Sequence, residues 1–236
     1  MSDLYLPPCC TTLSDHWPLP RALPGVQLIS TRFDPARLDA GDFDRSGIAA
    51  VNGVAKRQAE YLAGRLCARE ALRRVTGIAA VPAVGADRAP QWPAEVSGSI
   101  THGSGWAAAM VAHTSAWRGL GLDVERRLVP TRAERLAGEI LTPGELQQLQ
   151  GLTPEQRAER ISLTFSFKES LFKALYPLVL QRFYFQDAEL LSCHADGSAQ
   201  LRLLVELSGD WPAGSELDGQ FVEFDGYLLS LVAIPA

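Results

Sequence analysis

The chain has 236 residues and a formal net charge of −5, and 47% of its residues are hydrophobic. This length allows one large domain or two packed lobes with a substantial core. The charges are well mixed and form no basic tail, which excludes a general nucleic-acid binder, and no apolar run approaches the roughly 20 residues that span a bilayer. The first ten residues, MSDLYLPPCC, show no basic region followed by an apolar core, so we expect no secretory signal and a soluble cytoplasmic protein.

The first third of the chain predicts an extended segment, a strand and a long helix. Residues 1–24 hold five prolines, which favour an irregular strap lying across the body of the protein. Residues 26–33 predict the first strand. Residues 54–75, VAKRQAEYLAGRLCAREALRRV, are mostly strong helix formers with apolar residues almost all round, so we expect a helix that is buried on more than one side and capped by Gly77.

Two strands joined by a glycine-rich turn follow this helix. Residues 96–101 and 106–112 predict the strands, and Gly-Ser-Gly at 103–105 predicts the turn. His102 therefore lies where a strand meets a turn, a place where backbone can approach a ligand closely. By itself, a lone histidine is more often a structural residue.

The stretch GLGLDVERR, residues 119–127, places two acids after an apolar run. Asp123 and Glu125 are two residues apart, so on a strand both carboxylates point to the same face. After helix-prone residues 130–159, with helix starts at Thr142 and Thr153, the stretch 161–176 predicts another helix that Pro177 ends.

On that second helix, Glu169 and Lys173 are four apart and share one face. If the helix packs beside the strand, Asp123, Glu125 and Glu169 converge. Carboxylates this close repel one another, and a divalent cation is their expected common partner. Each motif taken alone also fits ordinary solvated charges or a surface ion pair.

The end of the chain alternates like strands at 188–193, 199–207, 220–224 and 227–234. Each set of strands follows a long helix. We therefore predict an α+β fold with two similar lobes related by a pseudo-twofold, each a small antiparallel sheet packed on a long helix. The predicted lobes are residues 1–118 and 119–236, and the metal motif would lie at the seam between them, a usual place for a ligand cleft.

Two motifs in this order resemble those of the 4′-phosphopantetheinyl transferases of the surfactin and enterobactin type. The first is Gly-hydrophobic-Asp-x-Glu, here GLDVE at 121–125. The second is aromatic-x-x-Lys-Glu-(Ala/Ser)-x-x-Lys, here FSFKESLFK at 165–173. Many relatives carry Trp where Phe165 stands, for which we expect a packing role. The resemblance covers about half of the chain.

The resemblance implies a reaction. The phosphopantetheine arm of coenzyme A would be transferred to a serine of an apo acyl or peptidyl carrier protein, which leaves adenosine 3′,5′-bisphosphate. Mg²⁺, with Mn²⁺ as the alternative, would be held by Asp123, Glu125 and Glu169. Asp123, Glu169 and Lys173 would be catalytic, with Glu169 as the general base and Glu125 as the alternative base. We expect a monomer.

The resemblance also implies a binding site for coenzyme A. Arginine meets phosphate oxygens bidentately, and histidine adds a donor near neutral pH. The residues expected to contact coenzyme A are Arg57, Arg65, Arg88, Thr101, His102, Lys168 and Lys173.

Two other functions stay open at this point. A Mg²⁺- or Mn²⁺-dependent phosphohydrolase could use the same three carboxylates with water as the nucleophile. An inactive module that binds coenzyme A or a carrier protein would keep the binding residues without turnover.

Overall fold

The computed structural model describes residues 5–236. Residues 1–4, the beginning of the predicted strap, lie outside the described residues. The chain divides into two compact units. Unit 1 comprises residues 1–17 and 23–116, and unit 2 comprises residues 18–22 and 117–236. Each unit is described by itself below.

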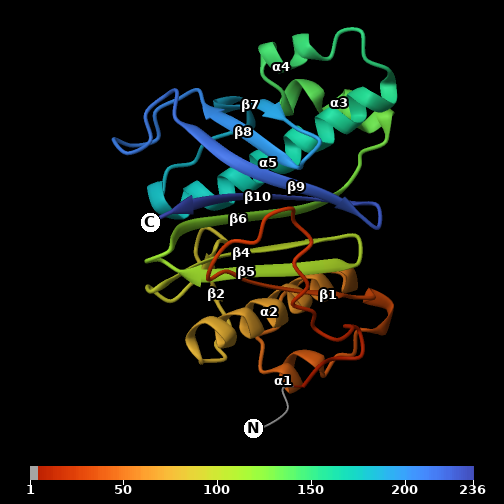
Figure 1. The fold of residues 1–236 in the computed structure, drawn as a ribbon. Coiled ribbons are helices and arrows are strands. Elements are labelled where there is room, and N and C mark those ends of the chain that lie inside the picture. Colours follow the sequence, from red (N-terminus) through yellow and green to blue (C-terminus); the bar gives the residue numbers. More distant parts are fainter. Residues whose placement is uncertain (1–4) are drawn as a thin grey trace. The chain divides into compact units, whose positions relative to one another are not determined.

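Unit 1 is a three-stranded antiparallel sheet with a long helix on it (Figure 1). The strand order is β1-β5-β4, with bounds of Gln27–Arg32 for β1, Val96–Gly103 for β4 and Trp106–His113 for β5. Smaller elements are the 3-10 helix η1 (Pro35–Arg37), α1 (Asp42–Ser46), and the strand pair β2 (Ala83–Val84) and β3 (Pro90–Gln91).

The long helix of unit 1, α2 (Ala55–Thr76), agrees closely with the predicted helix. Its residues are buried on several sides, as the apolar pattern indicated, and Gly77 ends it with a left-handed φ of 79°. Gly64 lets the helix approach the sheet, because an added Cβ would lie 2.8 Å from Ile100 Cγ2. Leu13, from the predicted strap, packs on the core between α2 and the sheet.

Unit 2 is a five-stranded antiparallel sheet crossed by one long helix (Figure 1). The strand order is β6-β10-β9-β8-β7, with bounds of Trp117–Arg126 for β6, Ala188–Cys193 for β7, Ser198–Leu203 for β8, Glu216–Phe224 for β9 and Tyr227–Pro235 for β10. The prediction for β8 was too long, because the pairing of this strand with β9 ends at Arg202. The 3-10 helix η2 (Phe185–Asp187) precedes β7.

Three helices lie between β6 and β7: α3 (Pro130–Ile140), α4 (Pro143–Gln148) and α5 (Pro154–Val179). The prediction that a helix starts at 161 and stops at Pro177 was wrong at both ends. The Thr153 capping box starts α5 directly, so it is one continuous helix. Pro177 lies within its last turn, where the missing N–H removes only one hydrogen bond near the helix end.

The α+β class with antiparallel sheets is confirmed, whereas the pseudo-twofold relation and the seam stay predictions. Across residues 5–236, none of the helices combines the length and the apolar character that crossing a bilayer requires.

Candidate active site

In unit 2, glycines and acids share one face of β6. Positions 119, 121, 123 and 125 alternate with the intervening residues and point to the same side. A Cβ at Gly121 would lie 1.8 Å from the Ser170 carbonyl oxygen, and one at Gly119 would lie 2.4 Å from the Ala174 carbonyl oxygen. Because these positions have no side chain, α5 lies directly against β6 next to Asp123.

Both carboxylate oxygens of Asp123 have partners on α5. The Lys173 ammonium lies 2.7 Å from Oδ1, and the Ser166 hydroxyl donates to Oδ2 over 2.9 Å. Lys173 also donates to the Leu122 carbonyl oxygen. Asp123 is only 4% exposed, so these bonds act in a largely desolvated environment.

Burial and the negative charge of Asp123 raise the pKa of Glu125 and of Glu169. Burial, followed by the charge of Asp123, raises the pKa of Glu125 to about 7, while Lys173 lowers it and Glu169 raises it further. Burial also raises the pKa of Glu169; Lys173 opposes this and Asp123 adds to it. Repulsion between carboxylates therefore contributes to the raised pKa of both glutamates, and their convergence on one cation stays a prediction.

The donor set fits a hard divalent cation. Three carboxylates offer only oxygen ligands, and a cation would relieve the repulsion between them. In the described part of the chain, no group of three or more His, Cys, Asp or Glu side chains is arranged to hold a metal ion. Lys173 instead supplies the positive charge next to Asp123. The fit therefore rests on ligand chemistry and charge.

Lys168 does not join this cluster, and its contact with coenzyme A stays a prediction. Its side chain is 2% exposed, and its ammonium bonds to Glu145 over 2.6 Å and to the Ile140 carbonyl oxygen over 2.8 Å. Glu145 also accepts from the backbone N–H groups of Thr142 and Leu190. Lys168 therefore fastens α5 to the α3–α4 connection, because helical spacing turns it away from Lys173.

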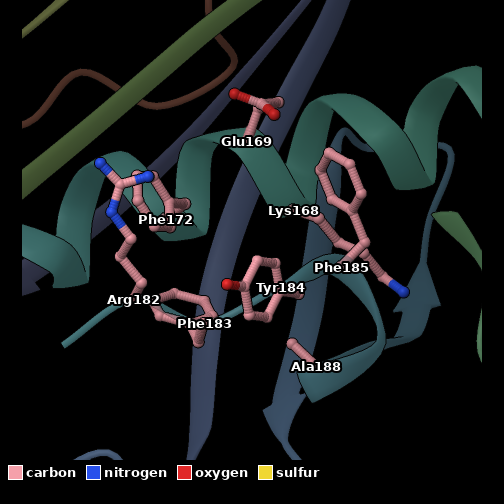
Figure 2. Close-up of a pocket in the computed structure, with 8 residues that line it drawn as sticks. All are labelled: Lys168, Glu169, Phe172, Arg182, Phe183, Tyr184, Phe185 and Ala188. Carbon is pink, nitrogen blue, oxygen red and sulfur yellow. The ribbon is translucent and has the colours of Figure 1, made fainter. Parts of the chain in front are cut away.

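A pocket of about 230 Å³ lies beside α5 (Figure 2). Lys168, Glu169 and Phe172 come from the helix, and Arg182, Phe183, Tyr184, Phe185 and Ala188 come from the segment after it. Four of these eight residues are aromatic and three are charged, with Glu169 as the acidic one. The pocket offers an apolar surface next to the carboxylate cluster.

Unit 1 holds a second pocket, of about 400 Å³, which is lined by cations. Four of the residues predicted to bind coenzyme A line it together: Arg57, Arg65, Arg88 and His102. Arg57 and Arg65 come from α2, whereas Arg88 lies in the β2–β3 turn with a left-handed φ of 72°. This concentration of guanidinium groups suits a ligand that carries several phosphates.

Arg65 is the most unusual of these cations. It is 5% exposed, and its Nε and Nη1 atoms are buried with no hydrogen-bond partner in residues 5–236. Its guanidinium lies 5.0 Å from the centre of the Tyr61 ring, one turn earlier on α2. Buried donors without a partner are costly, so Arg65 adds positive charge to this pocket at the expense of two unsatisfied N–H groups.

Arg57 and His102 contact each other at the same pocket. Arg57 Nη1 lies 3.1 Å from His102 Nε2, and since a guanidinium only donates, Nε2 accepts. The imidazole proton is then on Nδ1, which lies 3.7 Å from Glu60 Oε2. Thr101 does not line the pocket. Alternation along β4 turns its side chain to the opposite face from Ile100 and His102, where it is 2% exposed.

Two family models match the chain. One, described as the 4′-phosphopantetheinyl transferase N-terminal domain, matches residues 48–112, and the other, described as the 4′-phosphopantetheinyl transferase superfamily, matches residues 119–232. The 4′-phosphopantetheinyl transferase Svp of Streptomyces mobaraensis is 34% identical over 82% of this chain and 79% of its own length. The chain belongs to the 4′-phosphopantetheinyl transferase superfamily.

Other relatives of this transferase show the same family. The 4′-phosphopantetheinyl transferase Npt of Nocardia iowensis is 31% identical over 78% of this chain and 85% of its own length. Enterobactin synthase component D of Salmonella typhi is 37% identical over 69% of this chain and 67% of its own length. A Helicobacter pylori holo-[acyl-carrier-protein] synthase, solved with coenzyme A, has 17% identity and a TM-score of 0.34 over 50% of this chain and 99% of its own.

Some contacts of this phosphopantetheinyl transferase were not found from its sequence. Tyr61 could have been found, because it precedes Arg65 by one helical turn. Ser166 lies within the second motif, but its bond to Asp123 depends on tertiary packing. Arg182 and Tyr184 lie in the segment after α5, where no sequence motif marks them as lining a pocket.

Proposed function

We propose that this transferase requires Mg²⁺, moves phosphopantetheine from coenzyme A to a serine of an apo carrier protein and releases adenosine 3′,5′-bisphosphate. The observation that carries the proposal is the clustering of Asp123, Glu125, Glu169 and Lys173 where α5 packs on β6. A serine oxygen must attack a phosphorus atom surrounded by negative oxygens, so the reaction needs positive charge and a base.

Asp123, Glu125 and Glu169 would hold the cation. When bound, Mg²⁺ supplies positive charge against the pyrophosphate of coenzyme A. Lys173 adds a fixed ammonium, positioned by Asp123 and by the Leu122 carbonyl oxygen. These two hydrogen bonds fix the Lys173 ammonium in place, which supports a role in stabilising the negative charge that develops during the reaction.

Glu169 is our proposed general base for the serine hydroxyl. Its place on the pocket wall gives it access to a substrate, and the carboxylate oxygen that does not contact the cation would accept the proton. The aromatic pocket beside Glu169 would receive the pantetheine arm.

The 3′-phosphate of coenzyme A, which is separate from the pyrophosphate at the cation, would bind the cationic pocket of unit 1. Arg57, Arg65, Arg88 and His102 line that pocket, and their positive charge and N–H donors support binding of an anion. A simple phosphohydrolase would use the carboxylates and has no need of this pocket.

Intact-protein mass spectrometry tests the proposal. An apo acyl carrier protein is incubated with coenzyme A and the transferase, with Mg²⁺ or with EDTA. We expect a gain of one phosphopantetheine that EDTA abolishes and that Asp123→Ala reduces at least about 10²-fold. Asp218→Ala, at an exposed acid on β9, is the matched control and should transfer normally. Full transfer in EDTA would contradict the metal requirement.

A further inference from the structure

Three buried serines lie behind Asp123 in unit 2. Ser166 and Ser170 are one turn apart on α5, and Ser230 is on β10, directly opposite Asp123 in the pairing of β10 with β6. All three are 0% exposed. Two separate elements therefore direct hydroxyl groups to the same desolvated point.

The hydroxyls form a continuous chain. Ser166 Oγ lies 2.9 Å from Asp123 Oδ2 and 2.7 Å from Ser230 Oγ. Ser170 Oγ lies 2.8 Å from Ser230 Oγ and 3.0 Å from the Ser230 carbonyl oxygen. Every link has the length of a good hydrogen bond between oxygens.

The direction of this chain follows from the number of protons. A hydroxyl has one proton to donate, and the carboxylate can only accept, so the Ser166 proton points to Asp123. Ser166 must then accept from Ser230 in the contact between their hydroxyls. Ser170 donates its own proton to the Ser230 carbonyl oxygen, which can only accept, so the donors run from Ser230 through Ser166 to Asp123 Oδ2 while Ser170 holds the Ser230 backbone.

Neighbouring residues on α5 show that this arrangement is not the usual one for a helical hydroxyl. Ser162 donates to the Ala158 carbonyl oxygen and Thr164 to the Arg160 carbonyl oxygen, each four residues earlier in the helix. Ser166 and Ser170 instead reach out of the helix to β6 and β10. Tertiary packing, which is set by the glycines of β6, makes this possible.

We propose that Ser230, acting through Ser166, is a positioning residue that fixes the Asp123 carboxylate for cation binding. The hydroxyl chain occupies Oδ2 and sets the rotation of the carboxylate, so that Oδ1 is directed away from the chain, to the position where Lys173 now contacts it. The proposal rests on the proposed function, in which Asp123 is a ligand of Mg²⁺. Mutation of a residue that orients a metal ligand commonly weakens metal binding by about 10- to 100-fold.

The test measures Mn²⁺ binding by electron paramagnetic resonance, without coenzyme A or carrier protein. We expect Ser166→Ala and Ser230→Ala to raise the Kd for Mn²⁺ at least about 10-fold. The double variant should bind like Ser166→Ala alone, because Ser230 has no route to Asp123 once the Ser166 hydroxyl is gone. Ser162→Ala is the matched control, with the same substitution on the same helix at a 1% exposed site, and should bind like the wild type.

Several results would overturn the proposal: wild-type Mn²⁺ affinity in both single variants, additive losses in the double variant, or an equal loss in Ser162→Ala. Should Ser230→Ala fail to fold, Ser230→Cys replaces the hydroxyl with a thiol, a much weaker donor to Ser166, and must weaken Mn²⁺ binding for the proposal to stand. Transfer to an apo carrier protein is measured in parallel. If the wild type transfers only with Mg²⁺ and the variants keep the wild-type affinity for Mn²⁺, the positioning role alone is refuted. If the wild type does not transfer, the proposed function is refuted.

Discussion

Replacing Gly121 with alanine would force α5 away from β6. The new Cβ would lie 1.8 Å from the Ser170 carbonyl oxygen and 2.7 Å from the Ala174 nitrogen, where real contacts are at least 3.0 Å. The helix must therefore move by about 1.2 Å. Both partners are backbone atoms, so no side-chain rotation can relieve the clash, and we expect a loss near the upper end of overpacking, about 3 kcal/mol.

The same movement would separate Glu169 and Lys173 from the acids of β6. The Lys173–Asp123 contact, now 2.7 Å, would lengthen by a similar amount. Misplacement of catalytic groups by about 1 Å costs about 10²-fold in rate, so we expect a loss of that order in carrier-protein modification.

The free energy of unfolding is measured with urea, and transfer is measured by intact mass at saturating coenzyme A. Gly138→Ala is the control, because a Cβ there meets nothing within 4 Å and the exposed site lies in α3. That variant should gain about 0.5–1 kcal/mol and keep its activity. A Gly121→Ala protein with wild-type stability and turnover would show that the close contact of α5 and β6 does not build the site.

Three further changes test single residues. Glu125→Gln, measured by urea unfolding in EDTA, should match the stability of the wild type near pH 4.5 and exceed it by about 1–3 kcal/mol at pH 8. The reason is that ionising a carboxyl group whose pKa is about 7 in the folded protein destabilises the wild type as the pH rises from 4.5 through 7. An equal dependence of stability on pH in both proteins contradicts this. Lys168→Met should lower the free energy of unfolding by about 3–5 kcal/mol, because it leaves the Glu145 carboxylate buried without its ammonium partner, and adding Glu145→Gln should recover part of that loss. A loss under about 1 kcal/mol would refute a stabilising role for the buried pair. Arg65→Met should weaken coenzyme A binding at least about 10-fold by calorimetry with little loss of stability, and unchanged affinity would remove Arg65 from the site.

Local periodicity was enough to predict much of this protein. Alternation on a strand put Asp123 and Glu125 on one face, and four-residue spacing put Glu169 and Lys173 on one face of a helix. The long helix α2 could be predicted because its side chains alone favour a helix. Each of these predictions depends only on neighbours along the chain.

Tertiary structure decided the contacts between distant segments. Lys168 and Glu169 are adjacent in the sequence, yet the Lys168 ammonium is paired with the buried Glu145, whereas Lys173, one turn beyond Glu169, is paired with Asp123. Ser230 faces Asp123 only because β10 pairs with β6 in one register, and α5 reaches both because Gly121 lacks a side chain. The sequence by itself determined which side chains share a face of one strand or helix, since dihedral geometry repeats along an element. Which faces meet was decided by strand register and close packing, which arise only when the whole core is assembled.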